Sequence, residues 1–389
     1  MEHFSTVSAI CRASMKSPSN ALLTHIKKLI KALEKDNQLD QANSLREIIE
    51  NTKIVHELKP SRITLSKMSL SGETMPNGIK PPVDKESGSY LAEIFHSNEL
   101  ISSQPLFDPT LEKSINSLLD EWENADKLRE HGVNPAYSLM LFGMPGTGKT
   151  LLATYLASQL GLPLVVAKLD GLLSSFLGTT ARNIANLFNF ANRYKCVLLL
   201  DEFDAIAKLR DDPNELGELK RVVNTLLQCL DERNKLGYTI AITNHDSLLD
   251  PAIWRRFDLR IEIPKPSFEV RHLILENFSN KGAHLTPLQI NFLSKLTDNY
   301  SGSDIEKLLN FIKRKKIITH DEFEFMPTVL EFITLNANLT NKDFIEHLTS
   351  GDELLVKFLK NNDHFKLTQI EIAELINAKQ PTISRMLNK

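Results

Sequence analysis

The sequence predicts an α/β fold, a parallel sheet covered by helices and followed by further helices, and three observations lead to this class. Between residues 106 and 265, short apolar runs alternate with amphipathic stretches, which is typical of a parallel sheet. Beyond Pro264 only helical periodicity remains, which predicts a helical subdomain. The 389 residues are 42% hydrophobic and 24% charged, an ordinary composition for a globular chain of two or three domains.

The net charge, the cysteines and the apolar runs exclude several classes of protein. A formal net charge of -3 argues against a surface covered in nucleic-acid-binding charge, although not against one small binding module. The 3 cysteines include no C-x-x-C pair, so they form neither a disulfide framework nor a zinc site, and a reducing, cytoplasmic setting is expected. No apolar run reaches the ~18 residues of a membrane span and no signal peptide is evident, so no membrane partner is expected.

The chain divides into five zones in order. Residues 1–57 carry apolar side chains at helical spacing on both sides of Asp36-Asn37, which predicts a small helical hairpin that needs a neighbour to bury its face. Residues 58–105, rich in proline, serine and glycine, predict a linker. Residues 106–265 form the α/β part, 266–350 a helical subdomain, and 351–389 a separate helical segment. The strands are expected at 138–142, 164–167, 197–200, 238–243 and 259–263.

A glycine-rich loop follows the first of these strands. Residues 143–150 satisfy G-x-x-x-x-G-K-[ST], in which the glycines let backbone N–H groups approach phosphate oxygens closely. Lys149 would supply charge to the β- and γ-phosphates, and Thr150 a hydroxyl to Mg²⁺. An amphipathic helix after the loop adds its positive dipole end. The loop therefore predicts nucleotide binding, with these candidate residues: Pro145, Gly146, Thr147, Gly148, Lys149, Thr150 and Leu151.

Two carboxylates end the apolar run at 197–200. A buried parallel strand delivers its last residues to the ligand crevice, where Asp201 can hold Mg²⁺ and Glu202 can polarise an attacking water. Taken alone, the pair could also be an acidic turn that emerges into solvent. Its combination with the phosphate loop favours catalysis.

Residues 143–150 and 201–205 resemble the Walker A and Walker B motifs of the AAA+ ATPases, most closely those of the AAA branch. The resemblance covers about residues 106–330 and implies ATP and Mg²⁺ as cofactors and a helical lid after the sheet. Asn244 resembles sensor 1, which positions the hydrolytic water. Residues 301–305 resemble the lid turn that faces the nucleotide, which implicates Gly302 and Ser303. Gly132 and Val133 stand where the family cradles adenine.

Residues 249–258 resemble the arginine-finger segment of the same family, which reaches into the neighbouring subunit. The resemblance thus implies a homo-oligomeric ring, most simply a hexamer. The family usually spaces its two arginines, whereas Arg255 and Arg256 are adjacent here. The finger therefore stays open between them, with Arg256 preferred because it directly precedes Phe257. The alternative is that both arginines pair with acids of their own subunit.

Residues 174–180 stand where the family carries its substrate-gripping pore loop. Phe176 and Leu177 would then contact an extended polypeptide. The alternative is that Phe176 packs into the core, as most phenylalanines do.

The last residues predict a helix-turn-helix. Thr368 and Glu371 form a capping box, Asn377 suits a left-handed turn, and Pro381 opens the second helix. The candidate DNA contacts are Gln380, Thr382, Ser384 and Arg385. The same pair of helices could instead dock on protein. The basic run at 313–316 is expected to be a solvated helix face.

Two functions follow from these features. The first is a Mg²⁺-dependent ATPase ring that remodels a macromolecule, with a protein substrate or a partner protease. The layout also resembles prokaryotic AAA proteins that accompany subtilisin-like proteases in defence islands. Any proteolysis would belong to the partner, because the chain has no G-x-S-x-G motif. The second is a DNA-binding regulator switched by ATP.

Overall fold

The computed structural model describes residues 20–35, 38, 41–42, 45, 72–100, 103–172, 177–207, 216–319, 322–340, 345–347 and 351–388. The chain falls into two units, 1–67 and 68–389. In the first unit, α2 (Asn20–Lys35) buries Ile26, Ile30 and Leu33 along one side. This helix is the first half of the predicted hairpin, and most of the second half lies outside the described residues.

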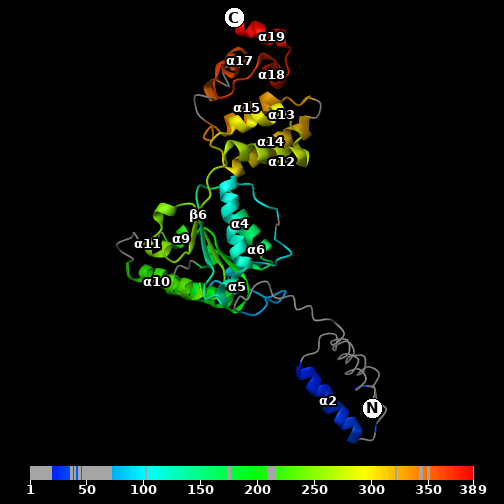
Figure 1. The fold of residues 1–389 in the computed structure, drawn as a ribbon, viewed down its shortest axis with the longest axis vertical. Helices are drawn as coiled ribbons and strands as arrows, with labels where there is room; N and C mark the ends of the chain where they lie inside the picture. The colour runs from blue at the N-terminus through cyan, green and yellow to red at the C-terminus, as the bar shows by residue number, and fades with distance from the viewer. Residues whose placement is uncertain are drawn as a thin grey trace. The chain divides into compact units, whose positions relative to one another are not determined.

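The second unit contains a six-stranded sheet in the order β1-β3-β4-β5-β2-β6 (Figure 1). Its strands from β2 to β6 are parallel, and they lie at the five apolar runs, which confirms the predicted α/β class. Strand order 3-4-5-2 places the C-terminal ends of β2, β4 and β5 side by side, where ligands bind in such sheets. The bounds are Ala92–Phe95 (β1), Ser138–Phe142 (β2), Leu164–Ala167 (β3), Val197–Leu200 (β4), Thr239–Thr243 (β5) and Leu259–Glu262 (β6).

The prediction of a linker over 58–105 is wrong for its second half. Strand β1 pairs antiparallel with β3, with Ala92 opposite Ala167 and Phe95 opposite Leu164. Upstream, the backbone N–H of Glu73 donates to the Arg193 carbonyl oxygen at 2.9 Å. Strand β1 therefore extends the sheet beyond β3 and pairs with the edge that β3 would otherwise leave open.

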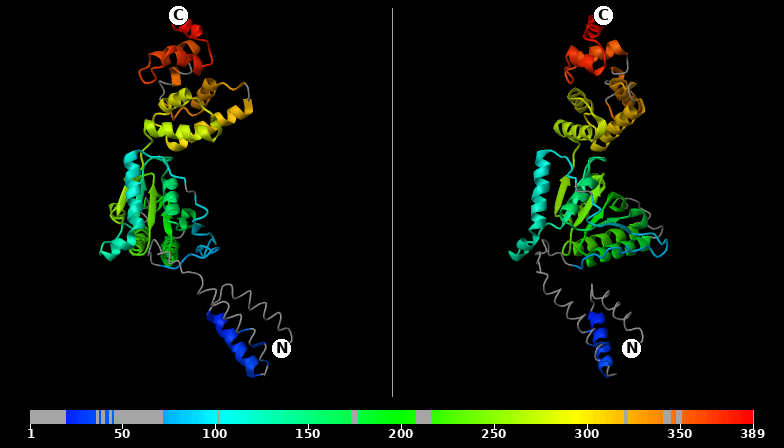
Figure 2. Two further views of the ribbon diagram at one scale, coloured as in Figure 1. Left: turned by 45° about the vertical axis from the view of Figure 1, so that its right-hand side comes forward. Right: turned by 90° about the vertical axis from the view of Figure 1, so that its right-hand side faces the viewer.

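Helices cover both faces of the sheet because alternate strand residues point to opposite sides (Figures 1 and 2). On one face, Leu139 and Leu141 pack in one core with α4 (Pro109–Glu123) and α6 (Lys149–Gln159). On the other face, Met140 belongs to the core formed with α8 (Leu177–Arg193) and α10 (Leu216–Arg233). The shorter helices are α5 (Ala125–Glu130), α7 (Leu169–Leu172), α9 (Asp204–Ala207), η2 (Asp246–Leu248) and α11 (Pro251–Trp254).

Beyond β6 the chain is helical, as predicted. The lid consists of α12 (Phe268–Phe278), a π-helical turn η3 (Ser279–Ala283), α13 (Pro287–Leu296), α14 (Gly302–Thr319) and α15 (Phe325–Leu335). Three further helices end the chain: α17 (Asp352–Asn361), α18 (Gln369–Leu375) and α19 (Gln380–Asn388). None of the helices in the described part of the chain is both long and apolar enough to cross a membrane.

The three last helices are not a separate segment, which corrects the boundary expected at residue 351. One hydrophobic core contains buried residues from both the lid and α17–α19, from Leu275 to Ile383. At its centre Phe365 is fully buried, with its ring 5.4 Å from that of Phe292 in α13. The Lys295 ammonium also donates to the Phe365 carbonyl oxygen at 2.8 Å. The C-terminal helices are therefore an extension of the lid.

Candidate active site

The glycine-rich loop at residues 143–150 lies very close to other parts of the chain at two of its glycines. Gly143 has a φ of +136°, and a Cβ there would overlap the carbonyl oxygen of Ile263 at the end of β6. Gly146 has a φ of +78°, and a Cβ there would lie 2.6 Å from the Ser301 hydroxyl oxygen. A side chain fits at neither position, so glycine lets the loop turn tightly between the sheet and the lid.

Lys149 lies at the first turn of α6 with only 5% of its surface exposed. Its ammonium donates to the carbonyl oxygens of Gly143 and Met144, each at 2.8 Å. Burial lowers the pKa of Lys149, and the nearby carboxylates of Asp201 and Asp204 oppose this shift. The loop thus encloses a positive charge at the start of a helix, which suits a bound polyphosphate.

The acidic pair lies directly across from this loop. The Thr150 hydroxyl donates to the Asp201 carboxylate at 3.0 Å, although the two residues are 51 positions apart. A hydroxyl and a carboxylate at this separation can share one Mg²⁺, which prefers oxygen ligands. Glu202 has a φ of +49° and an exposed side chain that lines the same cavity. A non-glycine residue in this conformation is uncommon and is found at functional sites.

The end of β5 supplies the third polar group. The Thr243 hydroxyl donates to the Asp204 carboxylate at 3.0 Å and accepts from the backbone N–H of His245 at 3.0 Å. These two bonds hold the strand end beside the start of α9. The next residue, Asn244, lines the cavity near Glu202.

The lid closes the other side of the cavity. The backbone N–H of Ser303 donates to the carbonyl oxygen of Gly146 at 3.0 Å, which joins α14 directly to the loop. The cavity has a volume of about 820 Å³. The structure brings together here all of the predicted loop residues from Pro145 to Leu151, the acidic pair, Asn244, Gly302 and Ser303.

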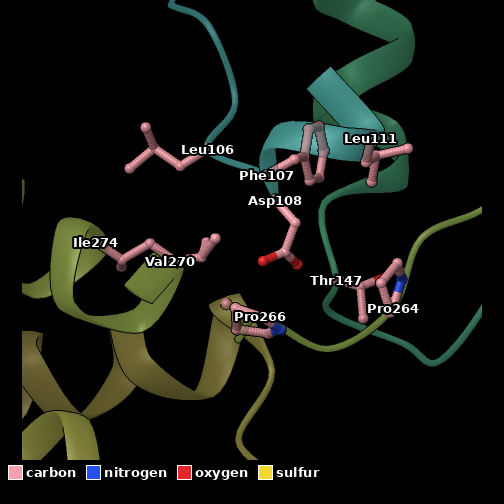
Figure 3. A pocket seen from close by; sticks show the side chains of 10 residues that line it. Leu106, Phe107, Asp108, Leu111, Thr147, Pro264, Pro266, Val270 and Ile274 are labelled. Atoms are coloured by element: carbon pink, nitrogen blue, oxygen red, sulfur yellow. The ribbon is translucent and has the colours of Figure 1, made fainter. Parts of the chain in front are cut away.

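Gly132 and Val133 are not among the described residues that line this cavity, and their contact with adenine stays a prediction. They follow α5, where Val133 is 54% exposed and its N–H donates to the Leu128 carbonyl oxygen. Apolar lining residues of the cavity that were not predicted include Phe107, before α4, and Ile274 in α12. Figure 3 shows both around a small adjoining pocket of about 30 Å³, together with Thr147 of the loop. The one local signal was an apolar pair, Leu106-Phe107, directly before the Asp108-Pro109 helix start.

The two arginines of the predicted finger lie in different surroundings. The guanidinium of Arg256 contacts the carboxylate of Asp231 in α10 at 2.8 Å. Arg255 is exposed. Neither is among the described residues that line the cavity. Arg256 thus has a partner in its own chain, whereas Arg255 has an exposed side chain, and the choice of finger between them stays a prediction.

None of the remaining candidates is among the described residues that line the cavity. Phe176 is outside the described residues, and α8 begins at Leu177. Gln380, Thr382 and Arg385 are exposed on α19, whereas Ser384 is half-buried. Within the basic run 313–316, the Lys315 ammonium pairs with Glu331 at 2.7 Å, and that of Lys316 donates to the His284 carbonyl oxygen at 3.3 Å. This run is thus partly engaged inside the lid.

A parallel sheet with this loop between strand and helix defines a P-loop nucleoside triphosphatase. Residues 139–265 match the model of the ATPase family associated with various cellular activities (AAA). Residues 139–265 therefore carry the sequence of an AAA ATPase module.

Known proteins share this module. The uncharacterized AAA family ATPase y4kL of Sinorhizobium fredii (strain NBRC 101917 / NGR234) is 42% identical over 214 residues, 53% of this chain and 64% of that protein. Proteasome-activating nucleotidase 2 of Haloferax volcanii is 36% identical over 193 residues, 48% of this chain and 47% of that protein. The chain therefore spans less than two thirds of either relative.

A solved structure has the same fold. The FIGL-1 AAA domain, crystallised with ADP, superposes with a TM-score of 0.50 at 21% identity. The match covers 69% of this chain and 93% of that domain.

Proposed function

We propose that this chain is a Mg²⁺-dependent ATP hydrolase that acts as a ring and uses hydrolysis to remodel a macromolecule, in the first place a protein. The observation that carries the proposal is the convergence on one cavity of Lys149, the Thr150–Asp201 pair and Glu202. Lys149 and Thr150 begin α6, and Asp201 and Glu202 follow β4, so the fold and not local sequence brings the four groups together.

Each group has one role in this proposal. Lys149 and the N–H groups of its loop hold the β- and γ-phosphates, while Thr150 and Asp201 hold Mg²⁺, which offsets phosphate charge when bound. Glu202 accepts a proton from the attacking water, and Asn244 orients that water. Phe107 and Ile274 provide the apolar walls for the base.

The ring is inferred from what the cavity lacks. Phosphoryl transfer in this class of enzyme uses an additional cation at the γ-phosphate. No arginine is among the described lining residues, and exposed Arg255 is available to a neighbouring subunit. A heterologous contact of this kind forms a closed ring when the rotation between neighbouring subunits closes, and a hexameric ring is our proposal. The likeness to a proteasome-activating nucleotidase supports a protein substrate and a separate partner protease.

A second candidate function is binding of duplex DNA through a C-terminal helix-turn-helix. The observation that favours it is the unit α17–α19, in which the capping box at Thr368 and the left-handed turn at Asn377 are both present.

The test compares two substitutions that affect different steps. Lys149→Ala should abolish ATP binding, because it removes the enclosed charge. Glu202→Gln should keep ATP bound and slow hydrolysis by about 10²–10⁴-fold, the contribution of a general base. Lys235→Ala, at an exposed lysine after α10, is the matched charge control. ATP affinity and turnover are measured with and without an unfolded protein such as casein. Equal loss of ATP affinity in both site variants, or no stimulation by casein, would contradict the proposal.

A further inference from the structure

The turn between α18 and α19 fixes the direction of the last helix. The N–H of Ala378 donates to the Ala373 carbonyl oxygen at 2.8 Å, and that of Asn377 to the Glu374 carbonyl oxygen at 3.3 Å. With Asn377 at a φ of +53°, these bonds form a Schellman turn. Ile383 of α19 is fully buried in the lid core. Helix α19 is thus held by a specific turn on one side and by packing on the other.

The outer face of α19 has the chemistry of a DNA-contacting helix. Gln380, Thr382 and Arg385 are exposed, and residues 380–388 include no acid. Lys379, directly before the helix, is also exposed. No large apolar side chain is exposed within Gln380–Asn388, all of which the structure describes. A helix that docks in a protein groove needs such apolar anchors, whereas contacts to bases and phosphates use arginine and short polar side chains.

A continuous set of contacts joins this face to the nucleotide loop. Lys295 in α13 donates to the Phe365 carbonyl oxygen, and its own carbonyl oxygen lies 2.9 Å from His364 Nε2. Phe365 packs on Phe292 of the same helix. At the other end of the lid, Ser303 donates to Gly146 of the loop. The lid and α17–α19 share one core, so a movement of the lid about that loop would carry α19 with it.

We propose that α19 lies in the major groove of duplex DNA and that the nucleotide in the cavity changes the affinity for this DNA, because lid and DNA-binding helix move as one body. This inference rests on the second candidate function and adds its regulation. Coupling between two sites is reciprocal, so bound duplex changes nucleotide affinity by the same factor.

The first measurement tests contact with DNA. Full-length protein is titrated against a fluorescent duplex of mixed sequence at two salt concentrations, and its affinity should fall about tenfold or more on a fourfold rise in salt. Arg385→Ala should weaken binding by about 5- to 150-fold. Lys360→Ala removes the same charge from α17 and should change the affinity by no more than about twofold. Thr382→Asp, which places a carboxylate on the exposed face, should also abolish binding.

The second measurement tests the coupling itself. Duplex affinity is compared between the ATP-loaded Glu202→Gln variant and the same variant loaded with ADP, and the two values should differ by about fivefold or more. Lys295→Met keeps the aliphatic stem and removes the bond to Phe365. This substitution should bring the ratio of the duplex affinities in the ATP and ADP states closer to one. It should leave the duplex affinity of the nucleotide-free protein unchanged.

Each outcome decides between the proposals. Duplex binding that is equal in the ATP and ADP states would overturn the coupling and leave the second candidate function standing. Absence of salt-sensitive duplex binding, or equal binding by Arg385→Ala, would overturn both and leave α19 to a protein partner. Neither measurement needs hydrolysis, so failure of the proposed ATPase activity does not affect the result.

Discussion

Replacement of Arg255 and Arg256, one at a time, should separate catalysis in a neighbouring subunit from packing within one chain. The two residues are adjacent in sequence, yet among the residues that the structure describes only Arg256 has an ion-pair partner, Asp231. Arg255 is exposed and lies outside the cavity of its own chain. We therefore expect Arg255→Ala to bind ATP normally and to lose turnover, and Arg256→Ala to keep most of its turnover.

The expected magnitudes differ widely. An arginine that contacts the γ-phosphate contributes a factor of about 10³–10⁵ to the rate of hydrolysis, so the turnover of Arg255→Ala should fall by that factor. The Arg256–Asp231 pair has side chains that are 35% and 49% exposed. Solvent screening limits such a pair to about 0–1 kcal/mol, which should lower the melting temperature of Arg256→Ala by no more than about 4 °C.

The assay is steady-state ATP hydrolysis by mixed rings. Arg255→Ala keeps the nucleotide loop and lacks the finger, whereas Lys149→Ala keeps the finger and lacks a working loop. Each variant should therefore be inactive alone. Random mixing in equal amounts places an intact loop beside an intact finger at about one interface in four. Activity should therefore appear on mixing and be highest near equal amounts.

Two results would refute this reasoning. One is the absence of any recovered activity at every mixing ratio, which would exclude action across subunits. The other concerns the matched control Asp231→Asn, which frees Arg256 without removing it. If Arg256→Ala lost turnover as severely as Arg255→Ala while Asp231→Asn kept it, Arg256 would be the finger in spite of its partner.

Two further predictions concern substrate contact and the lid core. Phe176→Ala should leave basal hydrolysis near the wild-type value and abolish stimulation by casein. The control is Leu248→Ala, at an exposed apolar residue. Severe loss of basal activity in Phe176→Ala would show that Phe176 is a core residue. Phe365→Ala should destabilise the lid by about 3–5 kcal/mol, as fully buried aromatic residues do when truncated. Thermal unfolding checks this, and Phe268→Ala, at a ring 39% exposed, should cost much less.

The sequence predicted those features that depend on short contiguous patterns. The loop 143–150 and the carboxylates after β4 each follow an apolar strand, so their position at the edge of a parallel sheet follows from local order. The capping box at Thr368 and the turn at Asn377 were equally local, because each needs only a few neighbouring residues.

The features that were missed depend on contacts between distant parts of the chain. Strand β1 has four residues in a proline-rich stretch, and only its pairing with β3 makes it a strand. The wall formed by Phe107 and Ile274 joins segments 167 positions apart, and no local pattern links the two residues. The ion pair between Arg256 and Asp231 could not be predicted either, because Asp231 lies 25 positions upstream on a different element.

The position of the C-terminal helices changes how their role has to be tested. A deletion from residue 362 would remove Phe365 and Ile383, two fully buried members of the core that they share with the lid. Such a deletion would expose Phe292 and weaken α14, the helix that contacts the nucleotide loop through Ser303, because α13 and α14 rest on the same core. Loss of ATPase activity or DNA binding in the truncated chain would then report only an unfolded lid. Substitutions on the exposed face of α19, such as Arg385→Ala, leave this core intact. They alone can separate what the last helix binds from what it stabilises.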